Sequence, residues 1–402
     1  MIIELIIALI VGVIVGTITG IAPGIHINLV GSVLLSFSAS IFLRIEPIFL
    51  AVFITAMSVT HTFIDFITSI YLGAPQDGTE LSVLPGHELL KKGNGHEAVL
   101  ITLLGSLIAI FLVILLSPLL IFSIPRLNLL IKPVIPFLLM IISIFLIMNE
   151  ETNKKISAFV VFVLAGILGL IALNLELKEP LLPLLTGLFG ASSLIISIKQ
   201  KTQIPEQKIS SLKKIEITRK DLLAPGIFAT FFSSILGFLP ALGSGQIAVI
   251  SSTIKKINNR QFLFSLGLIN PFMMILGFLT VYTISKGRTG SAVFIQEILG
   301  VISINQIILI LIISLISGIL AFIIGIKLSK FLAKNIGKIN YSKTSIFVLI
   351  FLSIIVIIFS GFLGAIIFII STFTGIYGIS LNVRRTNLMG CLLLPTIILY
   401  FI

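Results

Sequence analysis

Long apolar runs alternate with short polar links along nearly the whole chain. The runs are long enough to cross a bilayer as helices, for which about 20 apolar residues are needed. The clearest runs occupy residues 47–72, 97–124, 127–148, 156–173, 181–198, 262–284, 304–326 and 345–370, and a last apolar segment begins at 388. The pattern predicts an all-α polytopic membrane protein with about 10–12 membrane segments.

Glycine and proline interrupt two of the apolar regions at corresponding places. Residues 20–28 read Gly-Ile-Ala-Pro-Gly-Ile-His-Ile-Asn, and residues 237–245 read Gly-Phe-Leu-Pro-Ala-Leu-Gly-Ser-Gly. In lipid such a break is tolerated only where the freed backbone groups are buried in protein or line a cavity. We therefore predict two re-entrant or broken helical hairpins, at 2–43 and 222–254, whose paired breaks mark a transporter's substrate site.

The distribution of lysine and arginine predicts how these hairpins enter the membrane. The link 199–221 carries seven basic residues against three acidic ones, and 255–260 is basic as well. Basic loops face the cytoplasm, so both ends of 222–254 lie on that side. An odd number of spans separates the two hairpins, so the first hairpin enters from the opposite side.

This arrangement is an inverted repeat, a common architecture of secondary transporters. The polar stretch 285–291 and the lysine-rich stretch 327–343 are expected to be loops. The alternative is that 222–254 is one kinked span of a different fold. The predicted domains are an N-terminal transmembrane repeat, 1–198, a cytoplasmic basic linker, 199–221, and a C-terminal transmembrane repeat, 222–402.

Composition favours a membrane protein over a soluble or nucleic-acid-binding one. Hydrophobic residues make up 57% of the 402 residues and charged residues only 10%, whereas soluble domains carry about 25% charged residues. The net charge of +12 comes from a few basic loops, as expected of cytoplasmic loops, so no nucleic-acid partner is expected. The single cysteine, Cys391, excludes an intrachain disulfide.

Polar side chains form a stripe along the predicted span 47–72. An ionisable pair inside a span is expensive in hydrocarbon and by default faces a cavity, an ion or a proton path. His61 and Asp65 are therefore our first candidates for binding or relaying a coupling ion. The alternative is a structural pair that hydrogen-bonds packed helices together. The stripe has the three- and four-residue spacing of one helix face and consists of Ser58, His61, Thr62, Asp65, Thr68 and Ser69.

A polar stretch rich in glycine, Gly73–Asn94, follows this span. Asp77 is a third candidate for the coupling ion, because a carboxylate here suits a cation or a helix cap; an ordinary solvated loop is the alternative. Two His-Glu pairs, at 87–88 and 96–97, suggest a zinc protease, whose motif needs a second histidine four positions after the first. Lys91 and Leu100 stand at those positions, so that interpretation fails.

The second arm of each hairpin begins just after its break. A helix N-terminus offers unpaired N–H groups and a partial positive charge, which suit a carboxylate or phosphate. A serine-protease interpretation of residues 243–245 fails, because no His or Asp partner pattern accompanies them. The predicted substrate site consists of Pro23, Gly24, His26, Asn28, Pro240, Gly243, Ser244 and Gln246.

Two cations in the second half extend the predicted substrate site. Lys286 and Arg288 precede an apolar helix, with Ser291 as its expected N-cap. Two positive charges at a helix start fit an anionic substrate. The alternative is an interfacial loop, because lysine and arginine side chains also extend to the membrane surface at span ends.

Several strings in both halves and at the C-terminus resemble one transporter family. They are Gly20-Ile-Ala-Pro-Gly24, His61-Thr-Phe-Ile-Asp-Phe-Ile67, Leu72-Gly-Ala-Pro-Gln-Asp-Gly-Thr-Glu80, Gly93-Asn-Gly-His-Glu-Ala98, the 237–245 break and Val383-Arg-Arg-Thr-Asn-Leu-Met-Gly390. The family is that of the large permease subunit of the tripartite tricarboxylate transporters, and the chain is more closely similar to its shorter archaeal members. The resemblance covers essentially the whole chain.

The resemblance implies cation-coupled uptake of an organic anion, such as a di- or tricarboxylate, across the cytoplasmic membrane. The coupling cation is H+ or Na+, and no cofactor is expected. In the bacterial systems the permease works with a small membrane subunit and an extracytoplasmic solute-binding protein, whereas archaeal relatives often lack an evident binding protein. A homo-oligomer is a further expectation. Ala241 and His26 stand where the family usually or often has glycine, which leaves citrate-type specificity open.

Two other functions would use the same features. A carrier or flippase for a lipid-linked phosphate would share the helix-terminus chemistry and would need a lateral opening to lipid between the hairpins. An intramembrane enzyme would need a nucleophile with its base, or a metal triad, at the breaks. Neither pattern is visible in the sequence, so we expect a transporter and no enzyme activity.

Overall fold

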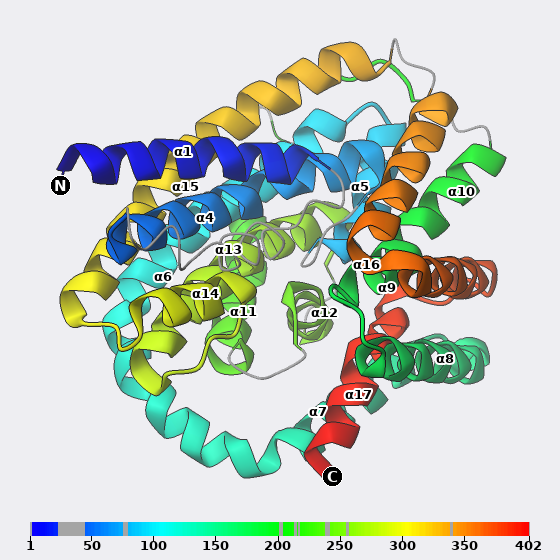
Figure 1. The fold of residues 1–402 in the computed structure, drawn as a ribbon. Coiled ribbons are helices and arrows are strands. Elements are labelled where there is room, and N and C mark those ends of the chain that lie inside the picture. Colours follow the sequence, from blue (N-terminus) through cyan, green and yellow to red (C-terminus); the bar gives the residue numbers. More distant parts are fainter. Residues whose placement is uncertain are drawn as a thin grey trace.

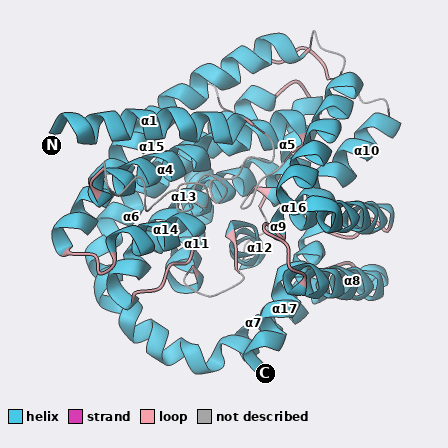
Figure 2. Ribbon diagram, viewed as in Figure 1, coloured by secondary structure: helices cyan, strands magenta, loops and turns pink. Residues whose placement is uncertain are grey.

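The described part of the chain consists of helices and connecting turns, without a β-strand (Figures 1 and 2). The structure is a computed structural model. It describes residues 2–22, 45–74, 79–200, 204–212, 215, 218–237, 242–254, 257–337 and 341–401.

The helices lie before and after the linker 199–221, and we call these two sets the first and the second series. The first series is α1 (Ile2–Ile21), α4 (Pro47–Leu72), η1 (Glu80–Ser82), α5 (Val83–Lys91), α6 (Gly95–Ile131), η2 (Lys132–Val134), α7 (Ile135–Met148), η3 (Thr152–Lys154), α8 (Lys155–Asn174), α9 (Leu181–Leu185), η4 (Thr186–Ala191) and α10 (Ser192–Lys199). The second is α11 (Arg219–Leu236), α12 (Ser244–Ile254), α13 (Asn259–Ile284), α14 (Gly290–Leu299), α15 (Ile304–Ile336), α16 (Tyr341–Ser380), η6 (Arg385–Met389) and α17 (Gly390–Phe401).

Eight helices in the described residues are long and apolar enough to cross a membrane. Helices α4 and α13 are enclosed by other helices over most of their length, whereas α1 and α16 expose most of their apolar side chains. Apolar surface of this extent is unfavourable in water, so lipid is its natural environment. The chain is a multi-pass membrane protein, which confirms the predicted all-α polytopic fold class.

Helix α1 lies along α4 with its backbone in close contact (Figure 1). A Cβ atom added at Gly16 would lie 2.3 Å from the Met57 carbonyl oxygen, and one at Gly20 would lie 3.2 Å from the Asp65 backbone nitrogen. Positions along α1 and α4 increase together, so the two helices run parallel and begin at the same end of the bundle. The face of α1 that makes this contact carries Gly12, Gly16 and Gly20.

Helix α11 lies along α13 in the same sense. Gly226 faces Phe264, and Gly237, at the end of α11, faces Met273. The starts of the two helices are joined, because Gln261 Nε2 donates a hydrogen bond to the Asp221 carbonyl oxygen at 2.9 Å. Helix α12 then ends at residue 254, five residues before α13 begins. Both ends of the predicted hairpin 222–254 therefore lie at the start of α13.

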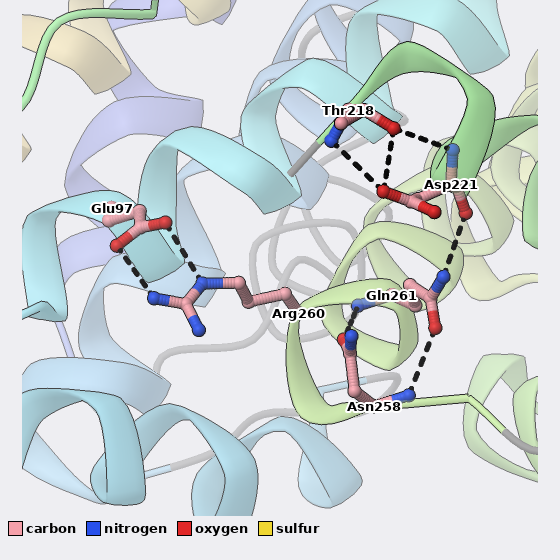
Figure 3. A network of polar contacts seen from close by, with 6 residues as sticks. All are labelled: Glu97, Thr218, Asp221, Asn258, Arg260 and Gln261. Carbon is pink, nitrogen blue, oxygen red and sulfur yellow. Dashed lines mark hydrogen bonds and ion pairs between the residues drawn. The ribbon is translucent and has the colours of Figure 1, made fainter. Parts of the chain in front are cut away.

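A polar network fixes the base of this hairpin (Figure 3). The Thr218 hydroxyl and the Asp221 carboxylate form a capping box at the start of α11. Asn258 and Gln261 form a second capping box at the start of α13. Such boxes satisfy N–H groups that the first turn of a helix leaves unpaired. The Gln261–Asp221 bond links the two boxes, and so it joins the start of α11 to the start of α13.

Helix α6, from the first series, packs in parallel on α13, from the second. Glu97 and Arg260 form a bidentate ion pair at 2.9 and 3.2 Å near the starts of the two helices (Figure 3). Farther along, a Cβ atom at Gly267 would lie 2.2 Å from the Thr102 carbonyl oxygen. Two helices from different halves of the chain therefore share one close-packed interface.

Helix α15, from the second series, packs in parallel on α4, from the first. Gly318 faces Phe63, and the Tyr71 hydroxyl donates to the Ser329 carbonyl oxygen at 3.2 Å. The Ser329 hydroxyl also lies 2.8 Å from His96 Nδ1, at the start of α6. The start of α6 is thus beside the end of α15, so these two helices run in opposite directions. It follows that α4 and α13 are antiparallel.

The remaining helices form a separate group. We call α1, α4–α6 and α11–α15 the core group, and α7–α10, α16, η6 and α17 the flanking group. Figure 1 shows the flanking group beside the core group, with α12 facing it. Glycine again allows helices to touch within the flanking group: a Cβ at Gly169 of α8 would overlap the Cys391 carbonyl, and one at Gly187 would lie 2.7 Å from the Phe368 carbonyl oxygen.

Three predicted boundaries are wrong: the gap between the runs 97–124 and 127–148, the end of the run 345–370, and the loop 327–343. The expected break at Pro125 does not occur, because α6 continues through Pro118 and Pro125 to Ile131 and bends around the edge of the bundle (Figure 1). Proline is tolerated within membrane helices where neighbouring groups satisfy the freed carbonyls. The run expected to end at 370 continues to Ser380, with a break at Gly361, where φ is 66°.

The predicted basic loop 327–343 is helical as far as Ile336. Lys327, Lys330 and Lys334 lie on the exposed face of α15, while Ser329 between them is buried. A helix that faces the aqueous phase on one side accommodates lysines at this spacing, and cations are favourable near its C-terminus.

Residues 204–212 of the predicted linker 199–221 are attached to the core group. Gln207 Oε1 accepts a hydrogen bond from the Gly95 backbone N–H at 2.8 Å, and its Nε2 donates to the Leu90 carbonyl oxygen at 3.0 Å. The linker therefore contacts the turn between α5 and α6.

We predict that Gly16→Ala destabilises the protein by about 2 kcal/mol, because overpacking a close contact costs about 1–3 kcal/mol. Gly226→Ala is the matched control, since its added Cβ would meet Phe264 at an ordinary 3.4 Å. The apparent melting temperature of each purified variant in detergent measures the difference. Equal melting temperatures for the two variants would contradict the backbone contact between α1 and α4.

Candidate functional site

The polar stripe of α4 lies inside the core group. His61 is 1% exposed and Asp65 is 0% exposed, so neither faces lipid. Groups this polar are buried only where they have partners. The stripe meets α1, α13, α14 and η1, and each contact is described below.

His61 and Thr68 face the C-terminal end of α1. Thr19 Oγ1 and His61 Nδ1 are 3.0 Å apart, and the Thr68 hydroxyl donates to the Gly20 carbonyl oxygen at 2.6 Å. The last carbonyls of a helix have no partner within the helix, so Thr68 satisfies one of them. Helix α1 therefore ends at the polar stripe.

Asp65 meets α13 through Asn270. Asn270 Nδ2 donates a hydrogen bond to Asp65 Oδ2 at 3.2 Å. The next residue, Pro271, has no N–H to offer the Gly267 carbonyl, and the Ser106 hydroxyl of α6 binds that carbonyl instead at 2.8 Å. A carboxylate in the second half of α4 thus contacts α13 near the middle of that helix.

The start of α12 contains three residues of the predicted substrate site. Gln246 Oε1 accepts a hydrogen bond from the Gly243 backbone N–H at 2.9 Å. Gln246 is 1% exposed and Ser244 is 3% exposed. Gln246 Nε2 is buried and has no hydrogen-bond partner among the residues that the structure describes. An unpaired amide N–H beside the first N–H groups of a helix is an arrangement that an anion would satisfy.

The short helix η1 connects the start of α12 with the polar stripe. A Cβ at Gly245 would lie 3.0 Å from Leu81. The next residue, Ser82, has its hydroxyl 2.7 Å from that of Ser69. Ser69 lies one helical turn beyond Asp65, because four residues make about one turn. Candidate substrate and ion residues therefore lie in one region of the core group.

Lys286 and Arg288 lie beyond the far end of α13. The rest of that helix, from Asn270 to Ile284, is about 21 Å long at 1.5 Å per residue. The structure thus places these two cations well away from the Asp65–Asn270 contact. Burial lowers the pKa of the Arg288 guanidinium to about 10, and within the described part of the chain its Nε has no hydrogen-bond partner.

The predicted N-cap at Ser291 is wrong. Thr289 caps α14, because its hydroxyl accepts a hydrogen bond from the Ala292 backbone N–H at 3.3 Å. The Ser291 hydroxyl accepts a hydrogen bond from Ser58 of the polar stripe instead.

Six predicted site residues lie outside the described residues. They are Pro23, Gly24, His26, Asn28, Asp77 and Pro240.

Over the part of the chain that the structure does describe, no group of three or more His, Cys, Asp and Glu side chains is placed to hold a metal ion.

Comparison with known proteins decides the family. The model of the tripartite tricarboxylate transporter TctA family matches residues 6–390. The chain belongs to this family. The predicted resemblance is confirmed, and it extends over nearly the whole TctA-family chain.

A relative is known from an archaeon. An uncharacterized protein of Methanocaldococcus jannaschii is 32% identical over 371 residues, which cover 87% of this chain and 88% of the relative. No solved structure matches the chain.

Sequence reasoning missed two residues at this site of the TctA-family protein, Thr19 and Asn270. Asn270 stands before Pro271 in an otherwise apolar run, and a polar residue beside a proline in a span is a usable signal. Thr19 lies three residues after Gly16, in a helix whose glycines at 12, 16 and 20 have the four-residue spacing of close-packed membrane helices. Its partnership with His61 depends on the tertiary fold.

The residues of the two His-Glu pairs contact other parts of the protein. His96 bonds to Ser329, and Glu97 pairs with Arg260. His87 lies on α5, close to Gly73, where an added Cβ would lie 2.7 Å from its ring. Burial, together with the positive charges of Arg385 and Lys91, lowers the pKa of His87 to about 3. His87 is therefore neutral at physiological pH.

This pKa predicts how stability depends on pH. Below pH 6.5 the unfolded chain binds a proton at His87 that the folded protein does not, so stability is lost as pH falls from about 6.5 toward 3. We expect His87→Gln to remove this contribution. The fall in apparent melting temperature between pH 7 and pH 5 should be smaller in the variant than in the natural protein. An identical fall in both would contradict the neutral, buried His87.

Proposed function

We propose that this TctA-family protein is a secondary transporter that carries an organic anion, of the di- or tricarboxylate class, across the cytoplasmic membrane together with H+ or Na+. The observation that carries the proposal is the buried start of α12, with its unpaired Gln246 amide, beside the region of Asp65 and Asn270. An anion-binding helix start and a cation-binding carboxylate in one region are what coupled transport of an anion requires.

The chain is proposed to be an inverted repeat that divides at the linker 199–221. The similar lengths of corresponding helices support this division: α4 and α13 both have 26 residues, α5 and α14 have 9 and 10, and α6 and α15 have 37 and 33. The antiparallel directions of α4 and α13 support it as well. Helices α1 and α11 would then be the first arms of two re-entrant hairpins, entering from opposite sides.

The anionic group of the substrate is proposed to bind at the start of α12. The first N–H groups of the helix and the Gln246 amide are hydrogen-bond donors there, and the helix dipole adds a partial positive charge. Gly243 leaves the backbone accessible at this point, and Ser244 supplies a hydroxyl. In this low-dielectric environment an oxyanion would gain more from these donors than it does in water.

Asp65 is proposed to bind the coupling cation, with His61 beside it. A carboxylate and neighbouring hydroxyl or carbonyl oxygens suit Na+, and protonation would neutralise the same carboxylate. Either event changes the charge at the contact between α4 and α13, which joins the two halves. Coupling is reciprocal, so a cation that favours the substrate-binding state must itself bind more tightly when substrate is present.

Family membership also suggests partners. Members of tripartite systems work with small membrane subunits and a solute-binding protein, and we propose the same kind of assembly, within the cytoplasmic membrane, for this chain. A homo-oligomer is compatible with the large apolar surfaces of α1 and α16. Lys286 and Arg288, on the far side of α13, would meet the substrate at the opposite end of its path.

Uptake into proteoliposomes tests the function. Purified protein is reconstituted and supplied with radiolabelled citrate or succinate, with a Na+ gradient, a pH gradient or neither. We expect uptake that depends on one of the two gradients. If polyprenyl phosphate is moved between leaflets and no carboxylate is taken up, the organic-anion proposal is wrong.

Asp65→Asn keeps the shape of the side chain and removes its charge. We expect it to reduce gradient-driven uptake at least tenfold, because the cation loses its carboxylate ligand. Thr55→Val is the control, since Thr55 is buried on the same helix and its hydroxyl donates to the Ala51 carbonyl oxygen one turn before it. Unchanged cation-driven uptake in Asp65→Asn, with Thr55→Val equally active, would exclude Asp65 as the coupling residue.

A further inference from the structure

A cavity of about 540 Å³ lies where the core and flanking groups meet. Helix α12 forms one wall through Val249 and Ser252, and α5 contributes Glu88. The turn before α17 contributes Arg384 and Arg385 from the opposite side. Cavities that bind small molecules have volumes of about 300–1,000 Å³, so this one has room for a small organic ligand.

Arg385 brings a positive charge into this cavity. Its Nη1 donates to the Phe189 carbonyl oxygen at 3.2 Å, which uses one of its five N–H groups. Within the described residues it forms no ion pair with a carboxylate. A guanidinium in a recess with only a neutral carbonyl partner is well placed to receive an oxyanion, and it does so with two parallel hydrogen bonds.

The turn that carries both arginines is held in place by Glu150. Glu150 is 7% exposed, and its Oε1 accepts hydrogen bonds from the Arg384 backbone N–H at 2.7 Å and from Asn387 Nδ2 at 2.9 Å. The carboxylate therefore binds the backbone and an amide, and it leaves the two guanidinium groups unneutralised. Fixing the turn in advance reduces the entropy that a ligand must overcome on binding.

The other walls of the cavity are suited to oxyanions. Asn149, Asn258 and Thr386 provide amide and hydroxyl donors. Glu88 opposes an anion, although its carboxylate accepts a hydrogen bond from Asn259. The cavity is thus lined by two guanidinium groups and one carboxylate, to which Asn259 donates a hydrogen bond.

The cavity extends along α12 toward its first turn. Leu81 lines it, and the same leucine contacts Gly245 at the start of that helix. At the other end it is lined by Asn258, which belongs to the base of the hairpin. One side of α12 therefore connects the proposed substrate site with the basic end of the hairpin.

We propose that this cavity is a second anion site, in which Arg384 and Arg385 bind the carboxylate or phosphate group of a small organic anion. The site holds the anion beside α12, at the end of the hairpin that the 199–221 linker joins. The proposal rests on the proposed function only for the role of the anion as transported cargo, since binding itself needs no transport.

Calorimetric titration of purified protein with citrate, and separately with inorganic phosphate, tests the site. We expect Arg385→Gln to weaken binding at least tenfold. Arg126→Gln is the matched control, because Arg126 is exposed and stacks on Phe122 at the outer surface, and its affinity should equal that of the natural protein. Binding of citrate alone identifies a carboxylate site, and binding of both identifies a general oxyanion site.

Glu88→Gln gives a readout in the opposite direction. It removes the opposing carboxylate, so anion affinity should rise several-fold, which a merely damaged fold would not produce. The site is excluded if Arg385→Gln binds citrate and phosphate as the natural protein does, or if Glu88→Gln binds them no more tightly.

Thiol labelling locates the bound anion. Cys391 is fully buried, so the natural protein serves as the unlabelled control for Ser252→Cys. We expect citrate to slow the reaction of Ser252→Cys with a methanethiosulfonate reagent several-fold, and to have no effect when Arg385→Gln is also present. Equal labelling rates with and without citrate would place the anion elsewhere.

The two proposals fail separately. Arginine-dependent binding in a protein that transports no carboxylate would overturn the proposed function and leave this site in place. Coupled transport by a protein whose affinity for citrate and phosphate is unchanged by Arg385→Gln would exclude this site and leave the proposed function in place. Gln246→Leu distinguishes the two places, because it should impair uptake while leaving protection of Ser252→Cys intact.

Discussion

Contact between helix backbones at glycine positions is the interaction on which the rest of this structure depends. In lipid there is no hydrophobic force between helices, so association relies on close packing and on hydrogen bonds. Gly16 and Gly20 let α1 press against α4, and Gly267 does the same between α13 and α6. Only backbones this close allow short polar groups, such as Thr19 and Thr68, to reach across the interface.

The polar site follows from this packing. Helix α1 ends at the stripe of α4, and α12 begins where η1 meets the same stripe. Helix ends inside a protein carry unpaired carbonyl or N–H groups, which must be satisfied by side chains, water or ligand. Thr68 satisfies one carbonyl, whereas Gln246 Nε2 at the start of α12 has no partner in the described residues. The described interior thus combines satisfied structural contacts with a helix start that has an unpaired amide.

Much of this organisation was predictable from the sequence, for local reasons. The span 47–72 agrees with α4 because proline and glycine mark its ends, and Ser244 starts α12 as its glycine-rich flank predicts. Boundaries that depend on neighbours were not predictable: α6 passes through Pro118 and Pro125, and the lysines of α15 stay helical. The site was found in part. Four of its residues were visible as polar residues among apolar ones: His61, Asp65, Ser244 and Gln246. The contact of Asn270 with Asp65 depends on the tertiary fold. The placement of Lys286 and Arg288 depends on the direction and length of α13. The coupling and binding roles of all these residues stay predictions.

The crosswise packing of the two series limits the motions open to the molecule. Each series gives its central helix to an interface with the other, α4 with α15 and α13 with α6. A rocking movement of the N-terminal half against the C-terminal half would break both interfaces, together with the Glu97–Arg260 ion pair. Among the described residues, the division with little packing across it runs instead between the core and flanking groups, and each of these contains helices from both halves. The two parts that move relative to each other in a transport cycle would therefore each contain helices from both halves of the chain, so neither moving part would correspond to one sequence repeat.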